Sequence, residues 1–82
     1  MSRRATVIGA GLIGGSVGIA LRKQGWTVST VDRDAEVATQ AIRVGAADEV
    51  GLDPASELVV IATPVGVIPA LALDALERCP QA

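Results

Sequence analysis

Short apolar runs alternate along this chain with longer segments in which apolar residues recur every third or fourth position. Residues 5–8 and 58–62 are continuously apolar and rich in β-branched side chains, which is typical of strands buried on both faces of a parallel sheet. Residues 27–31 alternate in polarity and are also β-branched, so they predict another strand. A vestigial strand is expected near residues 48–50.

The segments between and after these strands have the periodicity of helices. Helices are predicted at 12–24, 35–44 and 64–78. Gly25 and Gly45 follow the first two, where a left-handed residue ends a helix. Asp34 and Thr63 lie at the N-cap positions of the second and third, and Pro64 suits the first helical position. The chain therefore alternates strand and helix throughout.

Alternating strands and helices with short connections predict a parallel sheet wound by right-handed crossovers. The expected fold class is α/β, a partial Rossmann fold with three α/β/α layers and a parallel sheet of three to four strands. Residues 1–82 form one domain in this interpretation.

The connection from the first strand to the first helix matches the pattern G-x-G-x-x-G. Its six residues are Gly9, Ala10, Gly11, Leu12, Ile13 and Gly14. Gly9 permits a sharp turn off the strand, Gly11 removes a side chain that would block a pyrophosphate, and Gly14 lets helix and strand pack closely. The helix start then presents bare backbone N–H groups and the positive end of its dipole to the phosphates. A glycine turn with a purely structural role is the alternative.

An acid at the end of the second strand supports the dinucleotide interpretation. Asp32 lies 18 residues after Gly14, and a carboxylate there accepts hydrogen bonds from ribose hydroxyls but repels a 2′-phosphate. NAD is therefore expected rather than NADP. Arg33 could stack on adenine or partly neutralise a phosphate, or it could be a solvated surface charge. The structural alternative for Asp32 is a turn or capping acid.

The end of the last strand contributes a third group of candidate residues, Ala62, Thr63 and Pro64. Open α/β folds bind ligands at the carboxyl ends of their strands, so this turn could flank the nicotinamide half of the cofactor. A capped helix start explains Thr63 and Pro64 equally well.

Composition and charge narrow the possible partners. Half of the residues are apolar and the net charge is −2, with the basic residues scattered, so no nucleic-acid partner is expected. Cys79 is the only cysteine and histidine is absent, which predicts neither a metal site nor a disulfide. Arg3 and Arg4 before an apolar stretch imitate a secretory signal, but the glycines in that stretch favour a strand and a helix. No membrane span and a cytoplasmic location are expected.

Three segments together resemble the start of the prephenate dehydrogenases, including the arogenate dehydrogenases. They are Gly9-Ala10-Gly11-Leu12-Ile13-Gly14-Gly15-Ser16, Val31-Asp32-Arg33 and Leu58-Val59-Val60-Ile61-Ala62-Thr63-Pro64-Val65. The similarity spans nearly the whole chain, and Leu-Ile-Gly-Gly-Ser is its most specific part. The resemblance implies oxidative decarboxylation of prephenate or arogenate in tyrosine biosynthesis, with hydride passing to NAD⁺.

The resemblance assigns cofactor binding to residues of all three segments: Gly9, Ala10, Gly11, Leu12, Ile13, Gly14, Asp32, Arg33, Ala62, Thr63 and Pro64. It assigns no catalytic residue, because members of the family use a histidine and this sequence has none. Members also continue into a helical carboxyl-terminal domain that shapes the substrate pocket and the homodimer interface. We therefore expect residues 1–82 to be a truncated amino-terminal dinucleotide-binding domain that lacks the substrate site and is inactive alone.

Other functions use the same phosphate loop. The nearest rival is another Rossmann dehydrogenase, of the β-hydroxyacid or imine-reducing type. A second rival is a non-catalytic nucleotide-binding module, and a third is a minimal Rossmann unit without any ligand. Measured cofactor binding separates the third rival from the others.

Overall fold

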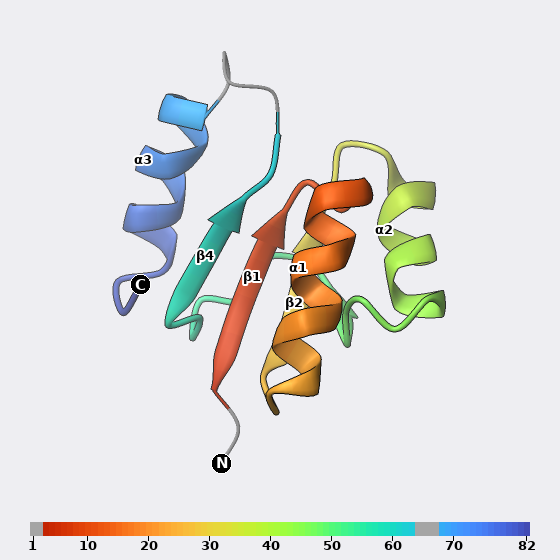
Figure 1. Cartoon of the computed structure of the whole chain (residues 1–82). Coiled ribbons are helices and arrows are strands. Elements are labelled where there is room, and N and C mark those ends of the chain that lie inside the picture. Colours follow the sequence, from red (N-terminus) through yellow and green to blue (C-terminus); the bar gives the residue numbers. More distant parts are fainter. Residues whose placement is uncertain (1–2, 64–67) are drawn as a thin grey trace.

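The computed structural model describes residues 3–63 and 68–82, and within them four parallel strands form one sheet (Figure 1). The strands are β1 (Arg4–Ile8), β2 (Thr27–Val31), β3 (Glu49–Val50) and β4 (Leu58–Ile61). Their order across the sheet is β3-β2-β1-β4, so the chain crosses from one edge to the other between β3 and β4. The predicted parallel sheet is confirmed, including β3, the two-residue strand in the segment where a vestigial strand was expected.

A helix follows β1, β2 and β4 in turn: α1 (Leu12–Lys23), α2 (Ala35–Arg43) and α3 (Ile68–Arg78). Asp34 is the N-cap of α2, as predicted, and its side chain accepts a hydrogen bond from the Glu36 amide (2.9 Å). Gly25 and Gly45 follow α1 and α2 with φ of 88° and 79°, a conformation that favours glycine. The predicted start of the last helix at Pro64 lies outside the described residues.

The core lies between the sheet and the two helices that precede β3. Val7 of β1 pairs in register with Thr30 of β2 and Val60 of β4. Val7 also belongs to a buried cluster of small side chains from β1, β2, α2 and the connection after α2: Val7, Val28, Ala41, Ala46 and Ala47. Because all of these side chains are alanine or valine, helices and sheet approach closely, which is how a short chain attains a packed interior.

The other face of the sheet is covered by a different part of the chain. Successive side chains of a strand point to opposite faces, so Thr6 points away from α1 and α2. Thr6 Oγ1 accepts a hydrogen bond from the Asp53 amide (3.2 Å) and shares another with Ser56 Oγ (2.6 Å). The Cys79 thiol, just after α3, donates to the Asp53 carbonyl (3.4 Å). The end of α3 therefore lies on the face opposite α1 and α2, which gives the predicted three layers.

Gly14 and Gly18 of α1 pack against different parts of the chain, and Gly14 packs as predicted. A Cβ on Gly14 would lie 1.8 Å from the Gly9 carbonyl oxygen and 3.2 Å from Val7 Cγ1, so this residue brings α1 directly onto β1. A Cβ on Gly18 would lie 2.1 Å from the Ala46 carbonyl oxygen. Ala46 belongs to the connection between α2 and β3, so Gly18 packs against a loop, whereas Gly14 packs against a strand.

None of the helices in residues 3–63 and 68–82 has the length and apolar character needed to span a membrane.

Candidate functional site

The carboxyl ends of β1 and β4 meet at the top of the sheet in Figure 1. The Ala62 amide donates to the Ile8 carbonyl (2.8 Å), which extends the pairing of these strands beyond their last residues. From this point the chain continues from β1 into α1 on one face, whereas the end of α3 lies on the other face. Neighbouring parallel strands whose connections leave toward opposite faces open a crevice, the usual ligand site in open α/β folds.

The glycine loop between β1 and α1 lies at this end of the sheet, where such folds bind ligands. Gly9 has a φ of 92°, and a Cβ there would lie 2.6 Å from the Ala62 carbonyl oxygen and 2.8 Å from Thr63 Cγ2. Gly9 and Gly14 are thus required by the packing of the protein itself. Gly11 is different, because a Cβ there would meet no atom of the described residues within 4 Å. Packing against the described residues therefore does not require a glycine at this position.

The start of α1 is electrostatically suited to an anion. Gly11 is the N-cap, no side chain caps the helix, and its first turn contains no acidic residue. The Gly15 amide donates to the Gly11 carbonyl (2.7 Å), so the amides before it have no partner within the helix. These N–H groups carry the positive end of the helix dipole, roughly half an elementary charge. A diphosphate is the kind of group that such a helix start binds without any lysine.

Two large apolar side chains beside the loop are open to solvent. Leu12 is 91% exposed and Ile13 is 72% exposed, although both lie in the first turn of α1. Exposed apolar residues at the edge of a crevice are typical of ligand sites, where binding removes them from water.

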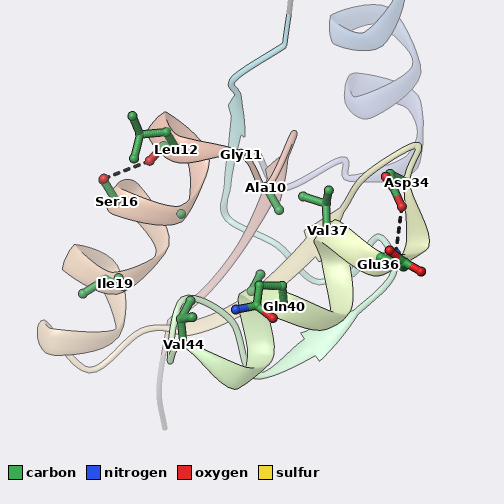
Figure 2. Close-up of a pocket in the computed structure, with 12 residues that line it drawn as sticks. Ala10, Gly11, Leu12, Ser16, Ile19, Asp34, Glu36, Val37, Gln40 and Val44 are labelled. Atoms are coloured by element: carbon green, nitrogen blue, oxygen red, sulfur yellow. Dashed lines mark hydrogen bonds between the residues drawn. The ribbon is translucent and has the colours of Figure 1, made fainter.

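Leu12 also borders a cavity of about 510 Å³ between α1 and α2. Figure 2 shows Ser16 and Ile19 of α1 on one side of it, with Val37 of α2 and Val44, which follows α2, on the other. Ala10 and Gly11 of the glycine loop line one end of the cavity. Asp32 and Thr63 do not line it. The cavity therefore adjoins the glycine loop but not Asp32 or the end of β4.

Asp32 follows β2 and is half-buried beside the glycine loop. Its Oδ1 accepts from the Asp34 amide (2.9 Å), so the turn role considered as an alternative is present. Its Oδ2 accepts from the Ala10 amide (2.9 Å), which connects the loop after β2 to the loop after β1. A carboxylate has about four lone-pair sites, so two are still available for ribose hydroxyls.

Arg33 is exposed and forms no ion pair with any described residue. Its position next to Asp32 is compatible both with contact to a bound nucleotide and with a solvated surface charge, so its role stays a prediction.

Thr63 lies at the end of β4 against Gly9. Its hydroxyl oxygen is buried and finds no hydrogen-bond partner among the described residues. An unpaired buried hydroxyl costs free energy, so this atom calls for a partner beyond the described residues. Ala62 and Thr63 lie against Gly9 of the glycine loop, while Pro64 lies outside the described residues.

The amino-terminal ends of the strands, opposite the glycine loop, hold a polar network that the sequence did not reveal. The Arg4 guanidinium pairs with Asp53 and with Glu49 (2.8 Å), and Asp53 also accepts from the Ala55 amide (3.0 Å). Burial raises the pKa of the Asp53 carboxyl, but Arg4 and the Ala55 amide lower it more, so its pKa lies below the ordinary value. This network joins the start of β1 to β3 and the following loop, which is a structural role.

Cys79 is fully buried on the same side of the molecule. Burial, and then the negative charge of Asp53, raise the pKa of its thiol. The thiol is consequently protonated at neutral pH, so it is a poor nucleophile and packs as a buried side chain.

The hydrogen bond between Asp32 and Ala10 is a feature of the site that sequence reasoning missed. The two residues are 22 positions apart, and nothing in the local pattern of either loop indicates the contact. Only the parallel pairing of β1 with β2 brings the two strand ends together.

Neither a protein-family model nor a curated protein matches the chain. Among solved structures, the chain is similar to Synechocystis arogenate dehydrogenase, with a TM-score of 0.74 and 29% sequence identity. The alignment covers 95% of this chain and 28% of the other, so the chain spans just over a quarter of that protein's length. The resemblance to the prephenate and arogenate dehydrogenases, first indicated by three sequence segments, is thereby confirmed for the fold and for nearly the whole of this chain.

Proposed function

We propose that this chain is the NAD-binding portion of a dehydrogenase that oxidatively decarboxylates prephenate or arogenate. The observation that carries the proposal is the bare start of α1: no described residue fills the space in front of Gly11, and no side chain among them caps the first amides of the helix. The similarity to Synechocystis arogenate dehydrogenase supports the reaction class. NAD⁺ supplies the hydride acceptor of that reaction, and this chain supplies its binding surface.

The residues present fit such a cofactor at three points. The amides at the start of α1 face the position of the diphosphate, where Gly11 makes room for it. The two free lone-pair sites of the Asp32 carboxylate accept the hydroxyls of the adenosine ribose. The Thr63 hydroxyl, which has no partner among the described residues, lies near Gly9 and donates to a polar group of the nicotinamide half.

A complete active site needs more than this surface. General-base catalysis requires a proton acceptor within hydrogen-bond reach of the substrate, and hydride transfer requires the substrate to be held over the nicotinamide. In the family resembled, a histidine has the first role, and this sequence contains no histidine. We therefore propose that residues 1–82 bind the cofactor and turn over no substrate by themselves, with substrate and homodimer contacts made by further parts of a longer protein.

The test is a pair of titrations with NADH and NADPH. Trp26 is the sole aromatic residue, so its emission is free of other protein fluorescence, and calorimetry gives an independent dissociation constant. We expect NADH to bind about tenfold more tightly than NADPH, a difference of ~1.4 kcal/mol, because Asp32 repels a 2′-phosphate. Equal or tighter binding of NADPH contradicts the role of Asp32, and absence of binding by both methods contradicts the proposed function.

A further inference from the structure

One carboxylate ties together the two loops that border the candidate diphosphate site. The Gly9 amide donates to the Val31 carbonyl (2.7 Å), so the pairing of β1 with β2 continues one step beyond the strand. The next amide, that of Ala10, donates to Asp32 Oδ2 (2.9 Å). Asp32 Oδ1 accepts from the Asp34 amide (2.9 Å), which fixes the orientation of the carboxylate from its own side.

Ala10, whose amide is held by Asp32, is the residue whose position matters most for binding an anion. Ala10 lies between Gly9 and Gly11, two residues with unusual conformational freedom, and Gly11 is the N-cap of α1. The peptide group between Ala10 and Gly11 sets how the bare amides at the helix start are presented. Without the tether, two flanking glycines would allow the loop several conformations, and only a fraction of the molecules would be ready to bind. The apparent dissociation constant rises in inverse proportion to that fraction.

We propose that Asp32 is a positioning residue that holds the glycine loop in its diphosphate-binding conformation, in addition to contacting the ribose. This inference rests on the proposed function, because it assigns a second task to a residue of the same site. It predicts that Asp32 contributes to the affinity for a diphosphate whose ribose has no hydroxyls to offer. A residue that only contacts the ribose has the opposite effect, since removing its negative charge favours an anionic ligand.

The test compares Asp32→Ala and Asp32→Asn with the unaltered chain, using 2′,3′-dideoxy-ADP as the probe, with ADP and NADH alongside. We expect Asp32→Ala to weaken binding of the dideoxy probe about tenfold, as when one molecule in ten keeps the competent loop. Asp32→Asn keeps one carbonyl oxygen that can accept the Ala10 amide, so it restores most of the affinity for the dideoxy probe. It does not restore the affinity for NADH, which uses the second oxygen.

Asp48→Ala is the matched control for Asp32→Ala. The Asp48 carboxylate accepts from the Val28 amide (2.8 Å) and pairs with Arg22 (3.0 Å) at the amino-terminal edge of the sheet, away from the glycine loop. It therefore shows the general cost of losing a bond between a carboxylate and a backbone amide, and we expect it to leave binding of the dideoxy probe unchanged. Thermal unfolding of each variant identifies any effect due to loss of the fold.

Hydrogen exchange of the Ala10 amide provides a readout that needs no ligand. We expect exchange at Ala10 to accelerate in Asp32→Ala, to recover in part in Asp32→Asn, and to stay unchanged in Asp48→Ala. The inference is overturned if amide exchange at Ala10 is unchanged in Asp32→Ala, or if this variant binds the dideoxy probe as tightly as the unaltered chain does. In either case the proposed function still stands as long as the unaltered chain binds NADH. An unaltered chain that binds neither NADH nor the dideoxy probe overturns both.

Discussion

Gly18 of α1 lies directly against the backbone of Ala46, so closely that a Cβ on Gly18 would be 2.1 Å from the Ala46 carbonyl oxygen. No real Cβ comes this near a backbone oxygen, so any side chain forces α1 and the connection before β3 apart. The contact joins the helix that begins at the glycine loop to the segment that leads into the edge strand. It therefore sets how α1 is seated on the sheet.

Gly18→Ala should consequently destabilise the protein. Overpacking of this kind typically costs about 1–3 kcal/mol, because the neighbour is backbone and cannot rotate away. Gly15→Ala is the matched control in the same helix, since its Cβ would be 3.9 Å from the nearest atom, the Ala10 carbonyl oxygen. It should be neutral or gain up to about 1 kcal/mol of helix propensity. Urea unfolding of both variants measures this, and equal stabilities contradict the packing argument.

Gly11→Ala should separate ligand binding from folding. The new methyl group enters open space, and Gly11 has a φ of −69°, which any residue adopts. The free energy of unfolding should therefore change by less than about 0.5 kcal/mol, as for an ordinary surface substitution. Affinity for NADH should fall at least about tenfold, because the methyl group occupies the place of the pyrophosphate. Calorimetry with NADH tests this, and retained affinity removes the main support for the diphosphate site.

Thr63→Val should have opposite effects on stability and on binding. It replaces a buried hydroxyl that has no partner among the described residues by a methyl group of the same shape. Stability should stay level or rise by about 1 kcal/mol, because an unsatisfied polar group is removed. Affinity for NADH and for nicotinamide mononucleotide should fall by about 2–10-fold, the value of one hydrogen bond, while affinity for AMP should not change. Lower stability with unchanged NADH binding indicates a structural role for the hydroxyl.

Asp53 should contribute to the acid sensitivity of the fold. Its pKa is lower in the folded protein than in the unfolded chain, despite the opposing effect of burial, because of Arg4 and the Ala55 amide. The resulting stabilisation is fully present above the unfolded pKa of 3.8 and is lost as the pH falls from there through the lower folded pKa. Asp53→Asn should thus lower stability at neutral pH and flatten the acid limb of a plot of stability against pH. A parallel shift of the whole curve contradicts this assignment.

The amino-acid sequence determined the order of the elements because each of its signals is local. Apolar runs mark strands that are buried in a parallel sheet, and Asp34 caps α2 through an amide only two residues away. The glycine pattern identified the loop for the same reason, since a sharp turn and a bare helix start are properties of adjacent residues. These features could be predicted without knowing which residues lie across the sheet from them.

Tertiary structure alone decided which of these local features meet. The parallel pairing of β1 with both β2 and β4 brings Asp32 to Ala10 and Thr63 to Gly9, and it places Gly18 against Ala46 by seating α1 on the sheet. Such contacts join residues 22 to 54 positions apart along the chain. The strength of these contacts depends on the distances between strands and helices. The periodicity of one segment contains no information about how far that segment lies from another. The sequence therefore determined the parts of the candidate site, and packing of the sheet decided their arrangement.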